Sequence, residues 1–89
     1  MQYLFDHAKQ AANVAKHGVF FSAAAAFEWE NAIVEVDSRH AYGEPHLTAI
    51  APIGERVHVM VFTLRETHVH IISLRKANSR EVRRYANHC

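Results

Sequence analysis

The sequence predicts a single α+β domain, in which two N-terminal helices precede an antiparallel four-stranded sheet and one helix ends the chain. Three observations lead to this fold class. Small apolar residues recur at helical spacing before residue 33, short β-type runs separated by turn residues follow to residue 74, and a capped, charged helical pattern begins at residue 78. Because 89 residues have room for one hydrophobic core, we expect one domain over residues 1–89.

The N-terminal helices are predicted from their caps. Asp6 is a favoured N-cap residue, alanines recur behind it at helical spacing, and Gly18 follows as a C-cap glycine. A second helix is expected to begin at Ser22 as its cap and to run through the alanines to Phe27. The small residues of the first helix favour close packing against another element.

Four strands are expected, over residues 33–36, 46–51, 57–64 and 68–74. The connections between them are short enough to join antiparallel neighbours, and they are rich in turn residues. The third strand is apolar on both faces, which predicts a central position in the sheet.

The last helix is predicted from Asn78 and Glu81, which have the spacing of a capping box, and it should reach about residue 87. Arg80, Arg83 and Arg84 recur at helical spacing and therefore share one face. From residue 75 to the end of the chain, five Lys and Arg residues stand against one acidic residue, although the whole chain carries a charge of only +1. This local patch is a solvated helix face or a surface for an anionic partner such as nucleic acid.

The cellular compartment is predicted from what the sequence lacks. The single cysteine, Cys89, excludes an intrachain disulfide, which suits a reducing compartment. The N-terminus lacks the pattern of a signal peptide, and no apolar run approaches the ~20 residues of a membrane span. We therefore expect a cytoplasmic protein with no membrane contact.

Basic and titratable residues cluster in the last predicted hairpin. Arg65 opens this hairpin, His70 lies in its second strand, and Arg75 with Lys76 leaves it, so the hairpin can bring all four near one edge or end of the sheet. Such a group suits metal-free cleavage of RNA, in which a base takes the ribose 2′-OH proton, cations stabilise the phosphoryl charge and an acid protonates the leaving 5′-oxygen. An exposed hairpin with ordinary surface cations is the alternative. The last helix adds Arg84 and Tyr85 to this group.

The histidines also raise the question of a metal site. His68 and His70 share a strand face, where His58 from the neighbouring strand could complete a zinc site. The sequence has no CxxC or HExxH motif and no carboxylate at a supporting spacing. We therefore expect no metal and no other cofactor.

Two more groups of residues have an alternative to a chemical role. In the polar loop over residues 37–44, His40 and Glu44 could act as acid–base partners, but a turn around Gly43 is favoured. Phe27 and Trp29 lie beside acidic residues that would repel phosphate, so we expect them at the edge of the core.

Several spaced motifs run in order along nearly the whole chain. The first comprises Leu4-Phe5-Asp6, Lys9, Asn13, Lys16-His17-Gly18-Val19 and Phe21, and the second comprises Asp37, His40 and Gly43-Glu44. The third comprises Val61-Phe62-Thr63, Arg65, Ile71-Ile72-Ser73-Leu74-Arg75-Lys76-Ala77 and Glu81-Val82-Arg83-Arg84-Tyr85. Together these motifs resemble the BrnT family of type II toxins.

The resemblance implies a RelE/ParE-like toxin fold and a ribonuclease activity that arrests translation and growth. It also implies a BrnA-like antitoxin that neutralises the toxin and through which a hetero-oligomer would bind operator DNA. Because RelE/ParE-like folds also host toxins that act by binding, for example on gyrase, the fold alone leaves that alternative open, together with a catalytically inert regulatory subunit.

On this basis we predict an endoribonuclease whose site lies in the C-terminal half of the chain. In this hypothesis Arg65 and Arg75 hold the scissile phosphate, and Lys76 or His70 handles protons. The family pattern has arginine at the positions of His70 and His46, so these two histidines could replace a phosphate contact, add an acid–base group or weaken the toxin. The predicted catalytic set is Arg65, His70, Arg75, Lys76 and Tyr85, and the predicted RNA-binding set is Arg80, Arg83 and Arg84.

Overall fold

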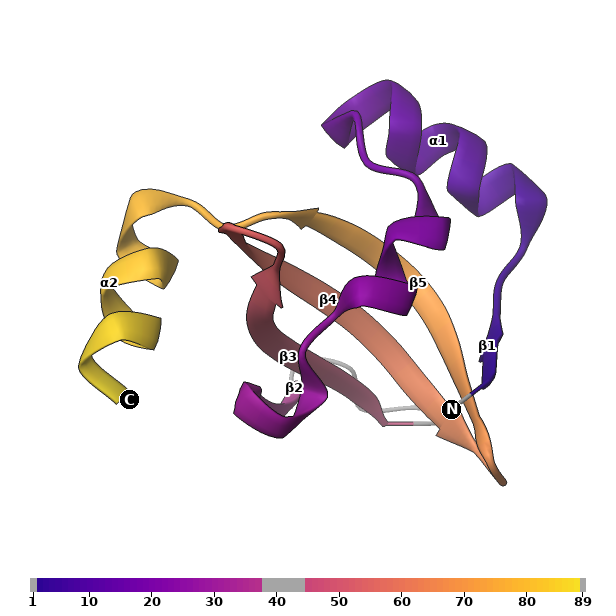
Figure 1. Ribbon diagram of the computed structural model, residues 1–89. Helices are drawn as coiled ribbons and strands as arrows, with labels where there is room; N and C mark the ends of the chain where they lie inside the picture. Colours follow the sequence, from indigo (N-terminus) through magenta and orange to yellow (C-terminus); the bar gives the residue numbers. More distant parts are fainter. Residues whose placement is uncertain (1, 38–44, 89) are drawn as a thin grey trace.

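The computed structural model describes residues 2–37 and 45–88 (Figure 1). Its elements in chain order are β1 (Gln2–Leu4), α1 (His7–His17), the 3-10 helices η1 (Phe21–Ala26) and η2 (Trp29–Asn31), β2 (Ile33–Asp37), β3 (His46–Ile53), β4 (Arg56–Arg65), β5 (His68–Lys76) and α2 (Ser79–His88).

The sheet has five strands in the order β1-β5-β4-β3-β2. Strands β2 to β5 pair antiparallel, as predicted, whereas β1 pairs parallel with β5. The α+β class and the C-terminal helix are confirmed, but the four-stranded, wholly antiparallel sheet is wrong. Strand β1 has three residues, which is too short for an alternating pattern, and its partner lies more than sixty residues along the chain.

The predicted second helix is also wrong, because residues 21–26 form the 3-10 helix η1. Its N-cap is Phe20, which makes no side-chain capping hydrogen bond, and Ser22 lies inside the element. Phe21 and Ala24 are both buried. Since side chains three residues apart eclipse each other in a 3-10 helix, this pair suits the tighter turn.

Helix α1 begins and ends as predicted. Asp6 accepts a hydrogen bond from the Ala8 amide at 2.7 Å, and Gly18 ends the helix with a φ of 72°. Such a left-handed conformation costs glycine no Cβ clash.

The buried Asn13 side chain attaches α1 to the sheet. Strand β1 pairs with β5 from His68 to His70, and farther along β5 the Asn13 amide takes the place of a strand. Its Nδ2 donates to the Leu74 carbonyl at 2.7 Å, and its Oδ1 accepts from the Leu74 amide at 3.2 Å. Nδ2 also donates to the Val19 carbonyl at 2.9 Å. One side chain therefore satisfies three backbone groups that would otherwise be buried without partners.

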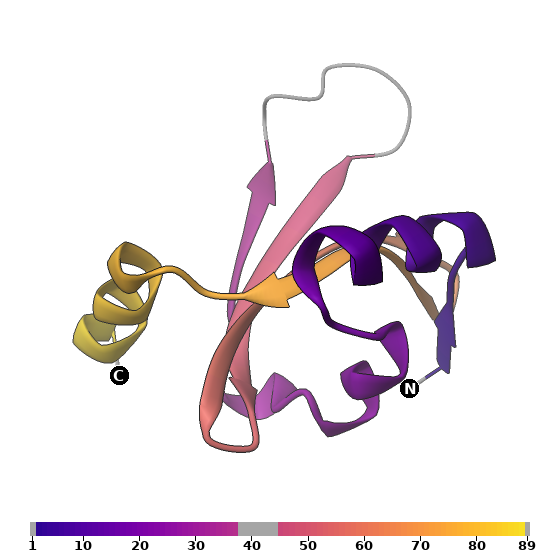
Figure 2. The same cartoon turned by 90° about the horizontal axis from the view of Figure 1, so that it is seen from above.

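The two faces of the sheet are covered by different elements. Helices α1 and η1 pack on one face, and α2 lies on the other side of the sheet (Figure 2). Strand alternation directs Ile33, Ile50 and Val59, which are buried, toward the face that carries α2. The main core lies under α1 and η1 and includes Phe21, Ala24, Phe27, Met60, Phe62, Val69, Ile71 and Leu74.

A β-bulge in β5 keeps this division of faces. Val61 pairs with Ser73 and Phe62 with Ile71, so Ile72 is the extra residue of the bulge. The insertion lets Ile71 and Leu74, three residues apart, both point into the main core. Residues on either side of the bulge can therefore also share the other face of the sheet, which carries α2.

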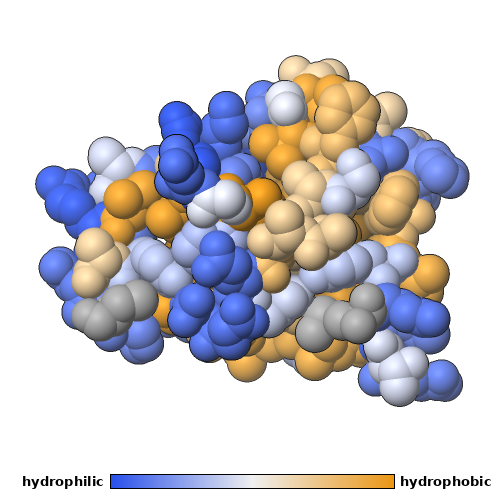
Figure 3. Space-filling model, in the orientation of Figure 1, coloured by the Kyte–Doolittle hydropathy of each residue, from blue (hydrophilic) through white to orange (hydrophobic). Residues whose placement is uncertain are grey.

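The surface differs between the two ends of the molecule. Figure 3 shows hydrophilic side chains over α2 and a more apolar surface over α1 and η1. Phe27 is buried and Trp29 packs against the core, as predicted for the two aromatic residues. Over residues 2–37 and 45–88, none of the helices has the length and apolar character needed to cross a membrane.

Candidate functional site

A row of polar residues crosses the sheet on the face that carries α2. Asp37 of β2 pairs with His46 of β3, and Thr63 of β4 pairs with His70 of β5. The register between β3 and β4 begins at Leu47 opposite Phe62, and one further residue places His46 opposite Thr63. Since opposed residues point to the same side, these four side chains share one face. Asp37, His46, Thr63 and His70 are called the polar row below.

Basic and acidic residues flank the polar row. Toward the turn between β4 and β5, Arg65 pairs with His68, and Arg65 is exposed. Toward the other end of the sheet, Glu35 pairs with Thr48 and forms an ion pair with Arg84 of α2. Helix α2 therefore lies beside the polar row and contributes a cation next to it.

Thr63 has an unusual position within the polar row. The residue is 4% exposed, and among the described residues its Oγ1 has no hydrogen-bond partner. A buried hydroxyl without a partner costs about 1–3 kcal/mol. Such groups are uncommon in native proteins and can mark functional sites.

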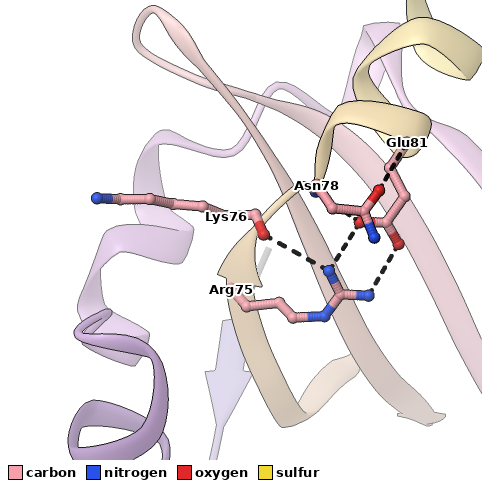
Figure 4. A network of polar contacts seen from close by, with 4 residues as sticks. All are labelled: Arg75, Lys76, Asn78 and Glu81. Atoms are coloured by element: carbon pink, nitrogen blue, oxygen red, sulfur yellow. Dashed lines mark hydrogen bonds and ion pairs between the residues drawn. The ribbon is translucent and has the colours of Figure 1, made fainter.

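Arg75 is engaged with the first turn of α2. Its guanidinium donates two hydrogen bonds to the Glu81 carboxylate, at 2.7 and 2.8 Å. These hydrogen bonds lower the pKa of Glu81 and raise the pKa of Arg75. The Glu81 carboxylate also accepts from the Asn78 amide and Asn78 Oδ1 from the Glu81 amide, both at 2.9 Å, which confirms the predicted capping box. Figure 4 shows this network, with the Lys76 side chain extending away from it.

Two further contacts fasten α2 to the sheet. The Tyr85 hydroxyl donates to the Asn31 carbonyl at 3.0 Å, and Arg84 pairs with Glu35. Arg80 and Arg83 of the same helix are exposed. The structure thus divides the basic residues of α2 between those that attach the helix and those that face solvent.

The expected grouping of the hairpin residues is wrong in one respect. Arg65 lies opposite His68 at the turn, whereas Arg75 lies opposite Val59 near the other end of β5. Seven residues of strand separate these two levels, which corresponds to about 20 Å. The antiparallel register therefore places Arg75 and Lys76 far from Arg65.

The hairpin does bring Arg65 and His70 together, with His46 and Thr63 beside them on neighbouring strands. In the sequence, His46 stands out only as a departure from a family motif, and no pattern marks Thr63 as a site residue. Strand alternation could have placed them on one face, but the register between β3 and β4 was needed to align them.

The other groups considered for chemistry have different outcomes. His58 lies under the opposite face and near the other end of the sheet from His68 and His70, and its Nδ1 lies 2.8 Å from the Arg56 carbonyl oxygen. Within residues 2–37 and 45–88, no three His, Cys, Asp or Glu residues are placed to hold a metal ion. His40 and Glu44 lie outside the described residues.

A second positively charged surface lies where α1 meets the outer edge of β5. A shallow groove there is lined by Lys9, Lys16 and His17 from the helix and by Ile72 and Ser73 from the strand. Partial burial lowers the pKa of His17, and the charges of Lys16 and Arg75 lower it further. Because this groove is formed with α1, which packs on the other face of the sheet, it is separate from the polar row.

The sheet with helices on both faces and a polar row beside a basic helix defines a small α+β protein with residue types suited to binding phosphate. The description "Ribonuclease toxin, BrnT, of type II toxin-antitoxin system" belongs to a family model that matches residues 5–81. The chain belongs to this family, as its motifs predicted.

A solved structure supports the fold assignment. The 1.1 Å crystal structure of the Brucella abortus ribonuclease toxin BrnT is similar to this chain, with a TM-score of 0.66 and 24% sequence identity. The similarity covers 89% of this chain and 100% of that chain, and at this identity it concerns the fold. No curated protein sequence matched the chain.

Proposed function

We propose that this chain is an endoribonuclease toxin that cleaves RNA without a metal ion and so inhibits translation and growth. The observation that carries the proposal is the polar row with Arg65 beside it, on a sheet face that α2 leaves partly uncovered. In metal-free phosphodiester cleavage, histidine can serve as acid or base and arginine can stabilise the charge on the phosphoryl oxygens. Membership in a ribonuclease toxin family gives the proposal its independent support.

The proposed roles follow the positions of the side chains. Arg65 holds the scissile phosphate, because its planar guanidinium stays charged and can make paired phosphate contacts. His70 transfers a proton, since it lies one level from Arg65 on the neighbouring strand. The exposed Arg80 and Arg83 bind the RNA backbone.

The remaining predicted site residues take supporting parts in this proposal. Arg75 and Lys76 lie too far along β5 to reach the phosphate held by Arg65, so of the two only the exposed Lys76 is assigned to RNA, away from the cleaved bond. Arg84 and Tyr85 keep α2 in place through Glu35 and Asn31. Arg75 does the same through Glu81.

The test is cleavage of purified RNA in EDTA by the wild type and by Arg65→Ala and Arg75→Ala. We expect the wild type to cleave, Arg65→Ala to lose at least 100-fold in rate, and Arg75→Ala to lose much less at a temperature where it is folded. Full activity in Arg65→Ala would reject its role. Cleavage that stops in EDTA and returns with a divalent ion would reject the metal-free mechanism.

The proposed partner is a BrnA-like antitoxin. An acidic or amphipathic segment of that protein would cover the cations around the polar row and α2. This segment would neutralise their charge and also block the access of RNA to the polar row. The complex would act in the cytoplasm and bind operator DNA through the antitoxin. Growth arrest on expression of this chain alone, and relief by the product of an adjacent antitoxin gene, would support this role.

A further inference from the structure

We propose that His46 and His70 form the acid–base pair of the reaction, one on each side of Thr63. The inference rests on the proposed ribonuclease function and assigns it a second proton-transfer group. It is carried by the register of three strands and by the buried Thr63 hydroxyl between the two histidines, which has no hydrogen-bond partner within residues 2–37 and 45–88.

The register sets the spacing of the two histidines. Strands β3 and β5 flank β4, and neighbouring strands lie about 4.8 Å apart, so the Cα atoms of His46 and His70 are separated by roughly 10 Å. Both side chains rise from the same face, and both residues are half-buried. In this proposal the imidazole of each strand leans toward the middle, and one phosphodiester group binds between the two rings.

The groups that face the pair come from every neighbouring strand. Asp37 lies opposite His46 on β2, and Leu4 of β1 lies opposite His70. Arg65 and His68 form the next level toward the turn, and the level on the other side ends in the ion pair between Glu35 and Arg84. Arg65 is thus one level from the histidines on the central strand β4, where it can bind a phosphoryl oxygen without taking part in proton transfer.

Thr63 is the independent observation. Its Oγ1 is buried between the two strands that carry the histidines and, among the described residues, it has no partner. A hydroxyl can both donate and accept, so it can bond to an imidazole nitrogen or to a phosphoryl oxygen when RNA separates the side chains above it. Such a bond would offset, in the complex, the cost of a buried hydroxyl that finds no partner among the described residues. Thr63 is accordingly assigned as a positioning residue.

The assigned reaction balances without a cofactor. One imidazole, in its neutral form, takes the proton of the ribose 2′-OH, and the 2′-oxygen forms a bond to phosphorus. The bond from phosphorus to the 5′-oxygen breaks, and the second imidazole, in its protonated form, gives its proton to that oxygen. The products are a 2′,3′-cyclic phosphate and a free 5′-OH, and the two histidines have exchanged protonation states.

The first experiment measures single-turnover cleavage and RNA affinity for His46→Ala and His70→Ala, with His88→Ala as the control. His88 is an exposed histidine at the end of α2. We expect each row variant to cleave at least 100-fold more slowly, to bind RNA within threefold of the wild type, and the control to match the wild type. Circular dichroism checks the fold, and His46→Gln and His70→Gln replace any alanine variant that fails to fold.

The outcomes separate this inference from the proposed function. A wild type that does not cleave RNA would overturn both. A wild type that cleaves, together with a row variant that cleaves at a similar rate, would overturn the histidine pair alone and leave the ribonuclease function standing.

The second experiment tells the acid from the base. A short RNA that spans the mapped cleavage site is made with sulfur in place of the leaving 5′-oxygen, because a thiolate leaves without needing a proton. We expect this substrate to restore cleavage by one of the two alanine variants, the one that lacks the acid, and not by the other. Restoration of both variants, or of neither, would overturn the assignment of one acid and one base.

Discussion

At the scale of single residues, Asn13 shows how one side chain can replace a strand. It is 5% exposed, and its amide pairs with both backbone groups of Leu74 on β5 while also reaching the Val19 carbonyl. The sequence motif includes this asparagine but gives no sign of its partner, because Leu74 lies 61 residues away. Its position in the motif is therefore explained by the attachment of α1 to β5.

We expect Asn13→Ala to lower the free energy of unfolding by about 2–4 kcal/mol, because it leaves three buried backbone groups without their partner. Lys9→Ala, at an exposed position of the same helix, is the matched control and should change stability by less than about 0.5 kcal/mol. Urea unfolding of the three proteins measures the difference. Equal stability of Asn13→Ala and the control would contradict the role of the amide.

At the scale of elements, α2 is held by its first turn as well as by its cap. The Glu81 carboxylate completes the capping box with Asn78 and also binds Arg75 in a paired geometry. Because Arg75 bonds to the charged carboxylate, the pKa of Glu81 lies below its ordinary value of 4.5. The unfolded chain thus binds a proton more readily than the folded one, so the pair stabilises fully above pH 4.5 and loses its effect as the pH falls through the folded pKa.

Glu81→Gln keeps a residue that completes a capping box but removes the charge. We expect it to lower the free energy of unfolding by about 1 kcal/mol at pH 7, and the difference from the wild type to shrink steadily as the pH falls below 4.5. Thermal unfolding across this range measures it, with Glu30→Gln at an exposed position of η2 as the control. A deficit that stayed constant down to the lowest pH would show that the ion pair is not its source.

The elements that sequence patterns predicted correctly are those defined by neighbours in the chain. The caps at Asp6, Gly18 and Asn78 depend on residues within a turn or two, and each gave the expected helix end. Strand β1 and the polar row depend on pairing between distant segments, which periodicity does not encode. The bulge at Ile72 also shifts the face of every later residue in β5, so alternation alone would misplace Arg75 relative to His70.

At the scale of the whole molecule, the sheet separates the main core from the polar row. The main core lies under α1 and η1, while the opposite face is shared between the residues beneath α2 and the polar row. The predicted site residues are divided in place: Arg65 and His70 lie at the polar row, and Arg75 attaches α2 through Glu81. The fold could be predicted in outline from the sequence. The register between β4 and β5, which decides which cations lie close enough to bind one phosphate, could not.

The exposed cations of α2 give the last prediction. Arg80 and Arg83 lie on the helix that borders the polar row, and neither position is needed for the contacts that attach this helix. If both bind phosphates, replacing them by alanine should weaken RNA binding to a similar degree for all sequences. The slope of log affinity against log salt should then become shallower by about 1.4, because each contact to a single strand contributes about 0.7. Cleavage at saturating RNA should be retained, since neither residue belongs to the polar row.

The double variant Lys9→Ala with Lys16→Ala removes the same charge from α1, on the other side of the sheet, and should leave the slope as it is. Equal loss of slope in both double variants would mean that total charge, rather than the position of α2, governs the binding of RNA.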